Sequence, residues 1–280
     1  MKSVLEILKS TTDYFAKAGV ESPRLNIEHL LAHVLGKRRM DLYLEFDRPL
    51  GEVELKPLRD LVRRRAGGEP LQHLLGTVEF MGKEFRSDAR ALIPRPETEQ
   101  FAERVMRLME EKGAEVKRVL DMGTGSGVLA LTFALKWPDA NVDAVDISAD
   151  ALALAKFNAE KLGVEGNVKF SQGDLLLPDG ETYQLAVANL PYIPTAQIAT
   201  LSREVQRDPI LALDGGADGG DLIRRFVLGV RERLVGLLGL EIGHDQADFL
   251  SRFLEESGYR DVRAEADYQG RNRFLFATYG

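Results

Sequence analysis

The stretch Asp121-Met-Gly-Thr-Gly-Ser-Gly127 decides the fold of this 280-residue chain. It follows a short apolar run at 118–122, and an Ala- and Leu-rich stretch begins at its last glycine. Three alternating glycines let the backbone turn sharply and present N–H groups to a ligand at a helix N-terminus. A dinucleotide fingerprint reads G-x-G-x-x-G, and the third glycine comes one residue early here, which disfavours NAD.

On the carboxyl side of this loop, short apolar runs alternate with helical stretches, which is typical of a parallel α/β sheet. The seven predicted strands are 118–122, 142–147, 168–171, 185–189, 237–242, 261–265 and 274–278. Helices are predicted at 98–111, 127–136, 149–162, 221–234 and 246–257. The last two strands are separated by only eight residues, too few for a crossover helix, so we expect them to pair antiparallel at one sheet edge.

The first 65 or so residues carry apolar side chains at intervals of three and four, the period of a helix. Ser22-Pro23 is typical of an N-cap and a first helical position, and Gly36 stands where that helix would end. Two β-like stretches flank Met81-Gly82 as a predicted hairpin. We therefore expect an N-terminal helical domain at 1–75, a hairpin linker at 76–90 and a second domain at 91–280.

Composition excludes several classes of function. The chain has no cysteine, so it has no disulfide, no thiolate metal site and no cysteine nucleophile. Its net charge of −7 argues against a large basic surface, so stable binding to nucleic acid is not expected. Glu6 interrupts the first apolar stretch, and prolines and polar side chains break up the uncharged residues 182–202, so neither a secretion signal nor a membrane span is expected. We expect a cytoplasmic protein without a metal site.

Two acidic residues follow the next two predicted strands. Asp146 stands about 20 residues after the glycines, where a carboxylate can accept hydrogen bonds from both hydroxyls of a ribose. Asp174 follows the third strand at a similar level. Each alone could simply cap a helix. Together with the glycine loop they favour a nucleoside-containing ligand across the carboxyl ends of the strands.

The fourth predicted strand ends in Asn189-Leu190-Pro191-Tyr192, with a second proline at 194. The prolines stiffen the turn, so it presents a side-chain amide, a backbone carbonyl and an aromatic ring in fixed relation. Such a turn suits N-methylation of a planar amide or amino group, whose nitrogen is a poor nucleophile. If Asn189 Oδ1 and the Leu190 carbonyl each accept one N–H, the lone pair is aimed at a methyl donor and the growing positive charge is stabilised.

At these residues the sequence resembles a class I S-adenosylmethionine-dependent methyltransferase, and more narrowly the HemK/PrmC family, which methylates the glutamine of release factors. The resemblance extends over nearly the whole chain, and its most diagnostic part is Ile93-Pro-Arg-Pro-Glu-Thr-Glu99. It also includes the helical start, 69–72, 215–219, and Glu241-Ile-Gly243 with Gln246. The implied fold is a seven-stranded Rossmann-like sheet preceded by a helical bundle and a hairpin.

The resemblance also implies site residues. S-adenosyl-L-methionine would be held by Gly123, Thr124, Gly125, Ser126, Gly127, Asp146, Asp174, Leu175 and Asn189. The catalytic turn would be Asn189, Leu190, Pro191 and Tyr192, and the substrate site would add Arg95 and Glu97. The family usually has Asn-Pro-Pro-Tyr, so Leu190 is a departure, although every residue supplies the required carbonyl. Leu175 stands where some members carry tryptophan.

The implied function is methylation of the side-chain amide nitrogen, N5, of the glutamine in the Gly-Gly-Gln loop of peptide chain release factors, a step of translation termination. The partner would be a release factor docked on the helical domain, and the enzyme would be a monomer. Basic residues that could dock an acidic surface of that partner are Arg38, Arg39, Arg63, Arg64 and Arg65, although such runs usually form solvated helix faces.

Other functions remain open from the sequence. Asn-Leu-Pro-Tyr also occurs in enzymes that methylate N6 of adenine in ribosomal RNA, but those chains place the glycine loop near the N-terminus and the helical domain after it. The same fold could methylate another protein glutamine or a small-molecule amine. A non-catalytic binding module is a further alternative.

Overall fold

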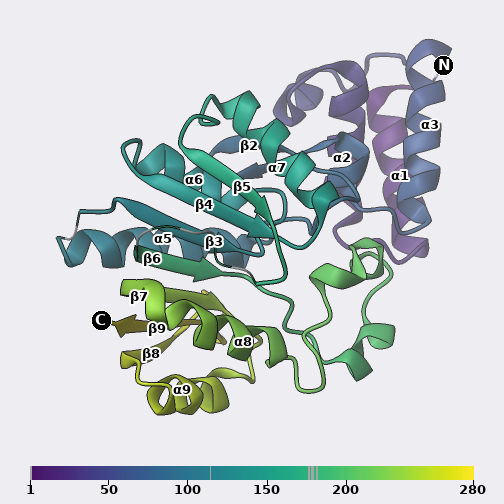
Figure 1. The fold of residues 1–280 in the computed structure, drawn as a ribbon. Helices are drawn as coiled ribbons and strands as arrows, with labels where there is room; N and C mark the ends of the chain where they lie inside the picture. The colour runs from purple at the N-terminus through teal and green to yellow at the C-terminus, as the bar shows by residue number, and fades with distance from the viewer. Residues whose placement is uncertain (1, 114, 176, 178–179, 181) are drawn as a thin grey trace. The chain divides into compact units, whose positions relative to one another are not determined.

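The computed structural model describes residues 2–113, 115–175, 177, 180 and 182–280 (Figure 1). The chain forms two compact units. One comprises the residues up to Thr77 together with Ser202–Arg207, and the other comprises Val78–Leu201 and Asp208–Gly280. The second piece of the first unit lies far along the chain from its helices.

The first unit is helical, as its apolar period predicts. Its elements are α1 (Val4–Lys17), α2 (Pro23–Leu35), η1 (Arg39–Leu44), α3 (Glu52–Ala66), α4 (Leu71–Leu75) and the short η3 (Val205–Arg207). Side chains such as Leu8, Phe15, Ile27 and Leu30 are fully buried and form its core. Burial of a large aliphatic or aromatic side chain contributes about 1.5–3 kcal/mol, so this core stabilises helices that would be marginal in isolation.

The start of α2 differs from the prediction. Pro23 is the first helical residue as expected, but the Ser22 side chain caps nothing, and Ser22 has a left-handed backbone with φ of 47°. Asn26 instead donates from Nδ2 to the carbonyls of Glu21 and Ser22 and fixes the preceding turn. Gly36, with φ of 61°, ends the helix as predicted.

The hairpin consists of β1 (Thr77–Phe80) and β2 (Lys83–Arg86). Met81 and Gly82 both have positive φ, the requirement of a two-residue turn whose twist matches the strands. Phe80 and Phe85 pack edge to face beneath the turn. The predicted hairpin is therefore confirmed.

The second unit is built on one seven-stranded sheet with strand order β5-β4-β3-β6-β7-β9-β8. The strands are β3 (Arg118–Met122), β4 (Asn141–Asp146), β5 (Val168–Gln172), β6 (Tyr183–Ala188), β7 (Leu234–Glu241), β8 (Arg260–Ala266) and β9 (Asn272–Tyr279). The first five are parallel, whereas β9 pairs antiparallel with β7 and β8. The predicted antiparallel pair at the sheet edge is confirmed.

Helices cover both faces of the sheet (Figure 1). One core contains side chains from α5 (Pro96–Glu111), α6 (Val128–Lys136) and α7 (Ala149–Leu162), and the other contains side chains from α8 (Asp221–Val230) and α9 (Ala247–Glu256). Val119 of β3 faces the first core and Leu120 faces the second, which explains why a doubly covered strand is apolar along its length. Three short turns, η2 (Thr195–Thr200), η4 (Ile210–Ala212) and η5 (Arg231–Arg233), lie in the connections.

The helix predicted at 221–234 is too long at its carboxyl end. The α-helix stops at Val230, η5 follows, and Leu234 begins β7, where it pairs with Tyr183 of β6. Gly236 has a backbone with φ of 153°, and a Cβ there would lie 2.2 Å from the Gln184 carbonyl oxygen. This close approach of two strands extends β6 and β7 beyond their predicted starts.

β3 lies between β4 and β6, and the chain leaves it in opposite directions along the sheet. This is the topological switch point, where an open parallel sheet forms a crevice at the carboxyl ends of its strands. The loop after β3, Asp146 at the end of β4, and Asn189 after β6 all lie at this edge.

Candidate active site at the sheet switch point

The glycine loop is held from below by a buried carboxylate. Asp121 accepts hydrogen bonds from the Thr124 hydroxyl at 2.7 Å and from the Ala130 backbone N–H at 3.0 Å. Burial raises the pKa of Asp121 to about 6, because few groups nearby compensate the charge. Its other oxygen, Oδ1, is buried and has no hydrogen-bond partner among the residues that the structure describes.

The glycines of this loop have different tasks. All three have positive φ, at 75° for Gly123, 56° for Gly125 and 88° for Gly127. A Cβ on Gly127 would lie 3.1 Å from Ala155, so this glycine lets α6 pack closely on α7. A Cβ on Gly125 would meet nothing within 4 Å, so only its backbone conformation and the open space beside it favour glycine.

Asp146 joins the end of β4 to the glycine loop. One carboxylate oxygen accepts from the Gly125 N–H at 2.8 Å, and the other accepts from the Ser148 N–H at 2.9 Å. Burial raises the pKa of Asp146, although these backbone donors oppose the shift. A carboxylate oxygen has two lone pairs, so each can accept a further hydrogen bond from a ligand.

The turn after β6 is packed against the glycine loop by Leu190. This side chain is 4% exposed, and its Cδ2 would lie 2.9 Å from a Cβ on Gly123. A Cβ at Gly123 would force the Leu190 side chain to shift, and the positive φ of Gly123 also favours glycine. Pattern reasoning valued Leu190 only for its backbone carbonyl and missed this packing role.

Glycines also hold the other side of the turn. A Cβ on Gly215 would lie 2.6 Å from the Pro191 carbonyl oxygen, and one on Gly219 would lie 2.2 Å from the Tyr192 carbonyl oxygen. Gln246 donates from Nε2 to that same Tyr192 oxygen at 3.0 Å. These contacts give a physical reason for the glycine-rich run at 215–219 that the sequence shows without explaining.

The Asn189 side chain is held by Thr98, and its environment includes the buried Glu241; pattern reasoning selected neither residue. Asn189 donates from Nδ2 to the Thr98 hydroxyl oxygen at 3.2 Å. Glu241, at the end of β7, is 2% exposed, and the polar side chains of Thr98 and Asn189 act to lower its pKa. Burial raises the pKa of Glu241 to about 7. Thr98 and Glu241 lie in stretches that carry the family resemblance, which was the available signal.

A third missed residue, Asp208, ties the segment before α5 to the wall of the site. Its fully buried carboxylate accepts from Arg95 Nη2 at 2.7 Å and from the Ile93 N–H at 3.4 Å. Pro209 follows it directly and lines the site. Arg95 thus shapes the site through Asp208. Asp208 carries no motif, and only the fold brings it to Arg95 across 113 residues of sequence.

The elements together line one cavity that is partly open to solvent. Seven of the predicted site residues line it: Gly123, Thr124, Gly125, Ser126, Asp146, Asn189 and Pro191. The other lining residues come from the segment before α5, from α6 and α7, and from the 209–212 turn: Arg90, Ala91, Leu92, Pro94, Thr98, Val128, Leu129, Ser148, Ala151, Pro209, Leu211 and Ala212.

The remaining predicted residues lie outside this lining: Gly127, Leu190, Tyr192, Arg95, Glu97, Asp174 and Leu175. Asp174 is half exposed and forms an ion pair with Arg225 at 2.9 Å. Leu175 has a left-handed backbone and packs at the edge of the core on the α8 side. Glu97 lies in the first turn of α5, as predicted, where its charge acts on Tyr192 and Glu241.

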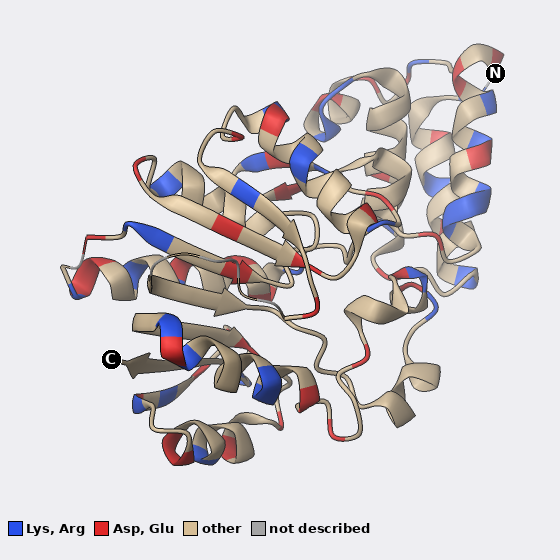
Figure 2. Cartoon of the chain, viewed as in Figure 1, with Lys and Arg blue, Asp and Glu red and all other residues tan. Residues whose placement is uncertain are grey.

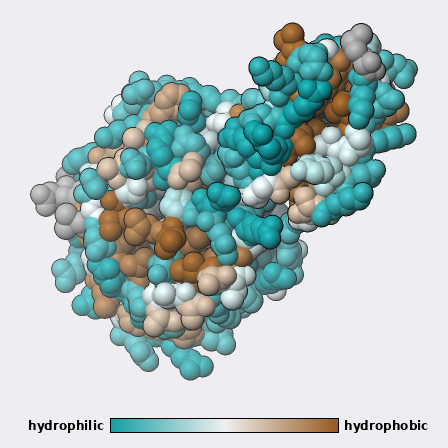
Figure 3. Space-filling model, turned by 90° about the vertical axis from the view of Figure 1, so that its right-hand side faces the viewer, coloured by the Kyte–Doolittle hydropathy of each residue, from teal (hydrophilic) through white to brown (hydrophobic). Residues whose placement is uncertain are grey.

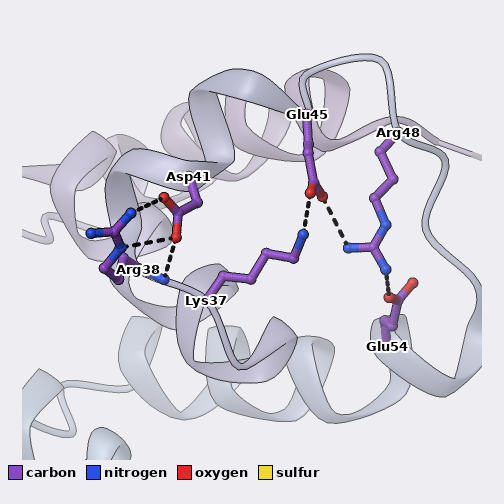
Figure 4. A network of polar contacts seen from close by, with 6 residues as sticks. All are labelled: Lys37, Arg38, Asp41, Glu45, Arg48 and Glu54. Carbon is purple, nitrogen blue, oxygen red and sulfur yellow. Dashed lines mark hydrogen bonds and ion pairs between the residues drawn. The ribbon is translucent and has the colours of Figure 1, made fainter.

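The basic residues proposed for docking a partner are paired with acids in the helical unit. Arg38 binds Asp41, and the chain Lys37, Glu45, Arg48 and Glu54 continues the network beside it (Figure 4). Arg39, Arg63 and Arg64 pair with Glu28, Asp60 and Glu69. Lys and Arg are interspersed with Asp and Glu on these helices (Figure 2).

Arg65 differs from the solvated face that its neighbours suggest. Its side chain is 5% exposed, and it donates to Asn26 Oδ1 at 2.6 Å and to Glu204 at 2.7 Å. Glu204 belongs to the 202–207 segment of the same unit. Arg65 is therefore an internal anchor rather than a surface docking residue.

Comparison with known proteins places this geometry in a family. Residues 6–76 match the PrmC N-terminal domain, and residues 114–199 match a methyltransferase domain. The release factor glutamine methyltransferase of Chlorobaculum tepidum is 40% identical over 98% of this chain and 96% of its own length. The corresponding protein of Bacillus subtilis is 39% identical over 99% of this chain and 98% of its own length.

Solved structures support the fold alone. The human Mettl16 catalytic domain, in complex with a MAT2A 3′UTR hairpin, has a TM-score of 0.59 at 15% identity and covers 95% of this chain and 91% of its own. The Thermus thermophilus 16S rRNA N2 G1207 methyltransferase, in complex with AdoMet and guanosine, has a TM-score of 0.53 at 18% identity over 73% of this chain and 50% of its own.

No helix among the residues that the structure describes is both long and apolar enough to cross a bilayer. The uncharged stretch at 182–202 is instead divided between the buried strand β6, the site turn and η2. With a helical first unit, a seven-stranded sheet whose switch point carries the glycine loop and the Asn189 turn, and close relatives over its full length, the chain belongs to the family of release factor glutamine methyltransferases.

Proposed function

We propose that this enzyme transfers the methyl group of S-adenosyl-L-methionine to the side-chain amide nitrogen of the glutamine in the Gly-Gly-Gln loop of a peptide chain release factor. The observation that carries the proposal is one cavity lined by both the glycine loop with Asp146 and the Asn189 turn. A donor site and an acceptor site for one transfer therefore share a wall. The near full-length relatives of that name support the substrate.

The donor half of the cavity fits S-adenosyl-L-methionine. Asp146 is a buried carboxylate on the cavity wall with lone pairs left for a ribose diol, and open space adjoins Gly125. We assign ribose binding to Asp146 and the methionine part to Gly123–Gly127. Asp174 and Leu175 do not line the cavity. We still propose them as neighbours of the adenine. When bound, the donor supplies an electrophilic methyl group.

The acceptor half prepares a weak nucleophile. The lone pair of an amide nitrogen is delocalised into its carbonyl group. We assign to Asn189 Oδ1 and the Leu190 carbonyl the role of accepting the two amide N–H groups, which orients the lone pair toward the methyl group and stabilises the growing positive charge. The proton can leave after transfer, so no strong base is required.

The wall of the cavity excludes water and offers a surface to a protein substrate. Pro191, Pro209 and Leu211 line it, and Leu211 is also 66% exposed, beside the equally exposed Ile210. Apolar side chains gather on the face of the molecule turned to the viewer in Figure 3. An extruded glutamine loop would exchange water for this apolar rim on docking.

The test is transfer of labelled methyl from S-adenosyl-L-methionine to a purified release factor, beside its Gly-Gly-Gln Gln→Ala variant and unmodified ribosomal RNA. We expect label only on the intact factor. Label on RNA alone would replace this function with adenine methylation, and label on neither would show that the substrate is another molecule.

Asn189→Ala separates an enzyme from a binding module. Loss of one group that stabilises developing charge typically lowers kcat by about 100–1,000-fold, while donor binding should change little because most of its proposed contacts come from the glycine loop and Asp146. Rates and calorimetric titration with S-adenosyl-L-methionine measure the two effects. Asn141→Ala, an exposed change at the opposite end of β4, is the matched control. Equal rates for the two variants would remove Asn189 from the mechanism.

A further inference from the structure

Asn158 is a fully buried polar residue of α7 that the proposed chemistry has not used. Its Oδ1 accepts from the Arg86 N–H at 2.7 Å, and its Nδ2 donates to the Ser126 carbonyl at 2.9 Å and to the Arg86 carbonyl at 3.3 Å. An unpaired polar group would be costly here, so the place needs one acceptor and two donors on neighbouring atoms. Among side chains, only a primary amide supplies this combination.

The Ser126 contact fixes the last peptide unit of the glycine loop. Ser126 lines the cavity, and its carbonyl accepts from Asn158. The N–H of Gly127, on the other edge of the same peptide bond, donates to the Thr124 carbonyl at 2.8 Å. Because a peptide bond is planar, its carbonyl and its N–H turn together. Hydrogen bonds on both edges therefore hold this unit in one orientation, just before α6 begins.

The Arg86 contact fixes a second wall of the cavity. Arg86 ends β2, which lies beside α7 (Figure 1). Asn158 bonds both backbone groups of Arg86, as a neighbouring strand would. The chain continues to the 90–94 segment, which lines the cavity, and Ala91 of this segment packs against Ala151 of α7. The helix therefore holds this part of the chain both before it reaches the cavity and along the wall.

One face of α7 serves both walls. Ala151, Ala155 and Asn158 are spaced by four and three residues, so they lie on the same side of the helix. Ala151 contacts the 90–94 segment, and Ala155 lies beside Gly127, where an added Cβ would be 3.1 Å away. Asn158 is bonded to the glycine loop and to β2. The two walls thus take their positions from this face of the helix.

We propose that Asn158 is a positioning residue for the methyl donor, which sets the spacing and orientation of the glycine loop relative to the 90–94 segment. Asn158 does not line the cavity, so it acts through Ser126 and Arg86. The inference deepens the proposed function and rests on its donor half. Walls that are held in place before binding spare the donor the cost of ordering them, which raises affinity. Without Asn158 that cost would fall on the binding of S-adenosyl-L-methionine.

Asn158→Leu is the main test, because leucine is similar in size and makes none of the three hydrogen bonds. We expect its affinity for S-adenosyl-L-methionine, measured by calorimetric titration, to be at least ten-fold below that of the wild type. KM for the donor should rise by a similar factor. The hydrogen bonds of Asn158 lead to the donor walls and not to the Asn189 turn, so kcat at saturating donor should change by less than three-fold.

Asn158→Ala is the milder variant and tests the proposal if Asn158→Leu fails to fold. Water can enter the space that is left and bond the Ser126 and Arg86 backbone groups, but it does not hold them in place as a fixed side chain does. We expect donor affinity at least three-fold below that of the wild type. Hydrogen exchange of the Gly127 amide should be faster in both variants, which measures the loosened loop in the free protein.

Two controls separate positioning from stability. Asn167 donates from Nδ2 to the Pro138 carbonyl at 2.7 Å and joins two connections at the opposite end of the sheet, so Asn167→Ala should leave donor affinity unchanged. Leu254→Ala opens a cavity in the core on the other face of the sheet. It should lower stability in urea denaturation and still bind the donor with wild-type affinity.

The proposal is overturned if a folded Asn158→Leu, or Asn158→Ala, binds the donor as tightly as the wild type. It is equally overturned if Leu254→Ala weakens donor binding as much as Asn158→Leu, because affinity would then follow stability alone. Weakened donor binding in the Asn158 variants, without methyl transfer by the wild type to the release factor, would support the inference and refute the proposed acceptor. Failure of the wild type to bind S-adenosyl-L-methionine would refute the donor half, and the inference with it.

Discussion

Leu190 shows how one side chain can depart from the family pattern and still serve the site. Its backbone carbonyl is proposed to bind the substrate, while its buried side chain fills the space above Gly123. A proline at this position would stiffen the turn but would not reach the same place in the core. Compared with proline, leucine makes the backbone of the turn less stiff, but its side chain packs the turn against the glycine loop.

Leu190→Ala tests this division of roles. Truncation of a buried leucine to alanine costs about 2–5 kcal/mol of unfolding free energy, partly through the cavity that remains. The carbonyl is kept, so kcat per folded molecule should fall less than ten-fold, far less than in Asn189→Ala. Urea denaturation and steady-state rates measure the two effects. Loss of activity as complete as in Asn189→Ala, with little change in stability, would contradict this assignment.

Glu241 also makes stability depend on pH. Its pKa in the folded protein is about 7, above the ordinary value of 4.5, so between these values the folded protein binds more protons than the unfolded chain. The free energy of unfolding therefore falls as pH rises through this window. A shift of this size corresponds to up to about 3 kcal/mol at pH 8, with 1.36 kcal/mol for each pKa unit.

Glu241→Gln should remove that part of the pH dependence. We expect the variant and the wild type to be nearly equally stable at pH 5, and the variant to be the more stable at pH 8, in urea denaturation at both values. Asp121, whose pKa is about 6, is present in both proteins and cancels in the difference. A difference that is constant from pH 5 to pH 8 would show that Glu241 does not titrate in this range.

At the scale of elements, the centre of the sheet could be predicted from the sequence because β3, β6 and β7 are mostly buried and read as short apolar runs. The ends could not be predicted as well. β7 begins at Leu234 rather than 237 because it still pairs with β6 beyond Gly236, across a shift of register between Tyr183 and Leu185, which is a property of two strands and not of one. The 3₁₀ turns between 195 and 212 carry no period, and only their contacts place them.

The glycine-rich loop at 215–219 illustrates an element whose composition is set by its neighbour. Gly215 does not have positive φ, yet a Cβ there would lie 2.6 Å from the Pro191 oxygen and 2.8 Å from Tyr192 Cα. Its hydrogen bond to the Ile193 carbonyl at 2.9 Å holds the loop in that place. Position 215 therefore requires glycine for a steric reason, because a side chain there would collide with the catalytic turn.

Gly215→Ala should displace the turn and spare the donor site. We expect kcat to fall at least ten-fold, because the Asn189 and Leu190 acceptors would shift by several tenths of an ångström or more, and positioning errors of about 1 Å can cost about 100-fold. Affinity for S-adenosyl-L-methionine should be nearly unchanged by calorimetry. Gly166→Ala is the matched control, since its Cβ would meet nothing within 4 Å. Equal kcat for both variants would show that the turn tolerates the added atom.

At the scale of the whole molecule, the sequence predicts the centre of the site better than its supports. The glycine loop, Asp146 and Asn189 stand at strand ends in recognisable spacing, and the fold brings them to one cavity. Thr98, Asp208 and Glu241 could not be ranked from the sequence, because their importance lies in contacts across the fold. For the same reason nothing in the sequence indicates that residues 202–207 belong with the helical unit.

Residues 202–207 are joined to the helices of the first unit by an ion pair between Glu204 and Arg65. Residues 202–207 stand in sequence between the Asn189 turn and the 209–212 wall of the cavity, and Glu204 binds the buried Arg65 at 2.7 Å. Glu204→Ala leaves Arg65 with Asn26 and the Glu69 carbonyl as remaining partners. Because Glu204 is one-third exposed and water can replace part of the contact, we expect a cost of about 1–2 kcal/mol.

The loss of stability should appear first as local opening of residues 202–207. We expect faster limited proteolysis between 195 and 213 and a higher KM for the release factor, with unchanged affinity for S-adenosyl-L-methionine. Glu52→Ala breaks a surface-exposed ion pair with Arg59 and should leave both the stability and the cleavage rate nearly unchanged. If both variants are cleaved at the wild-type rate, Glu204 does not anchor the segment, and the hydrogen bond that the Arg207 side chain donates to the Gly67 carbonyl is the next candidate.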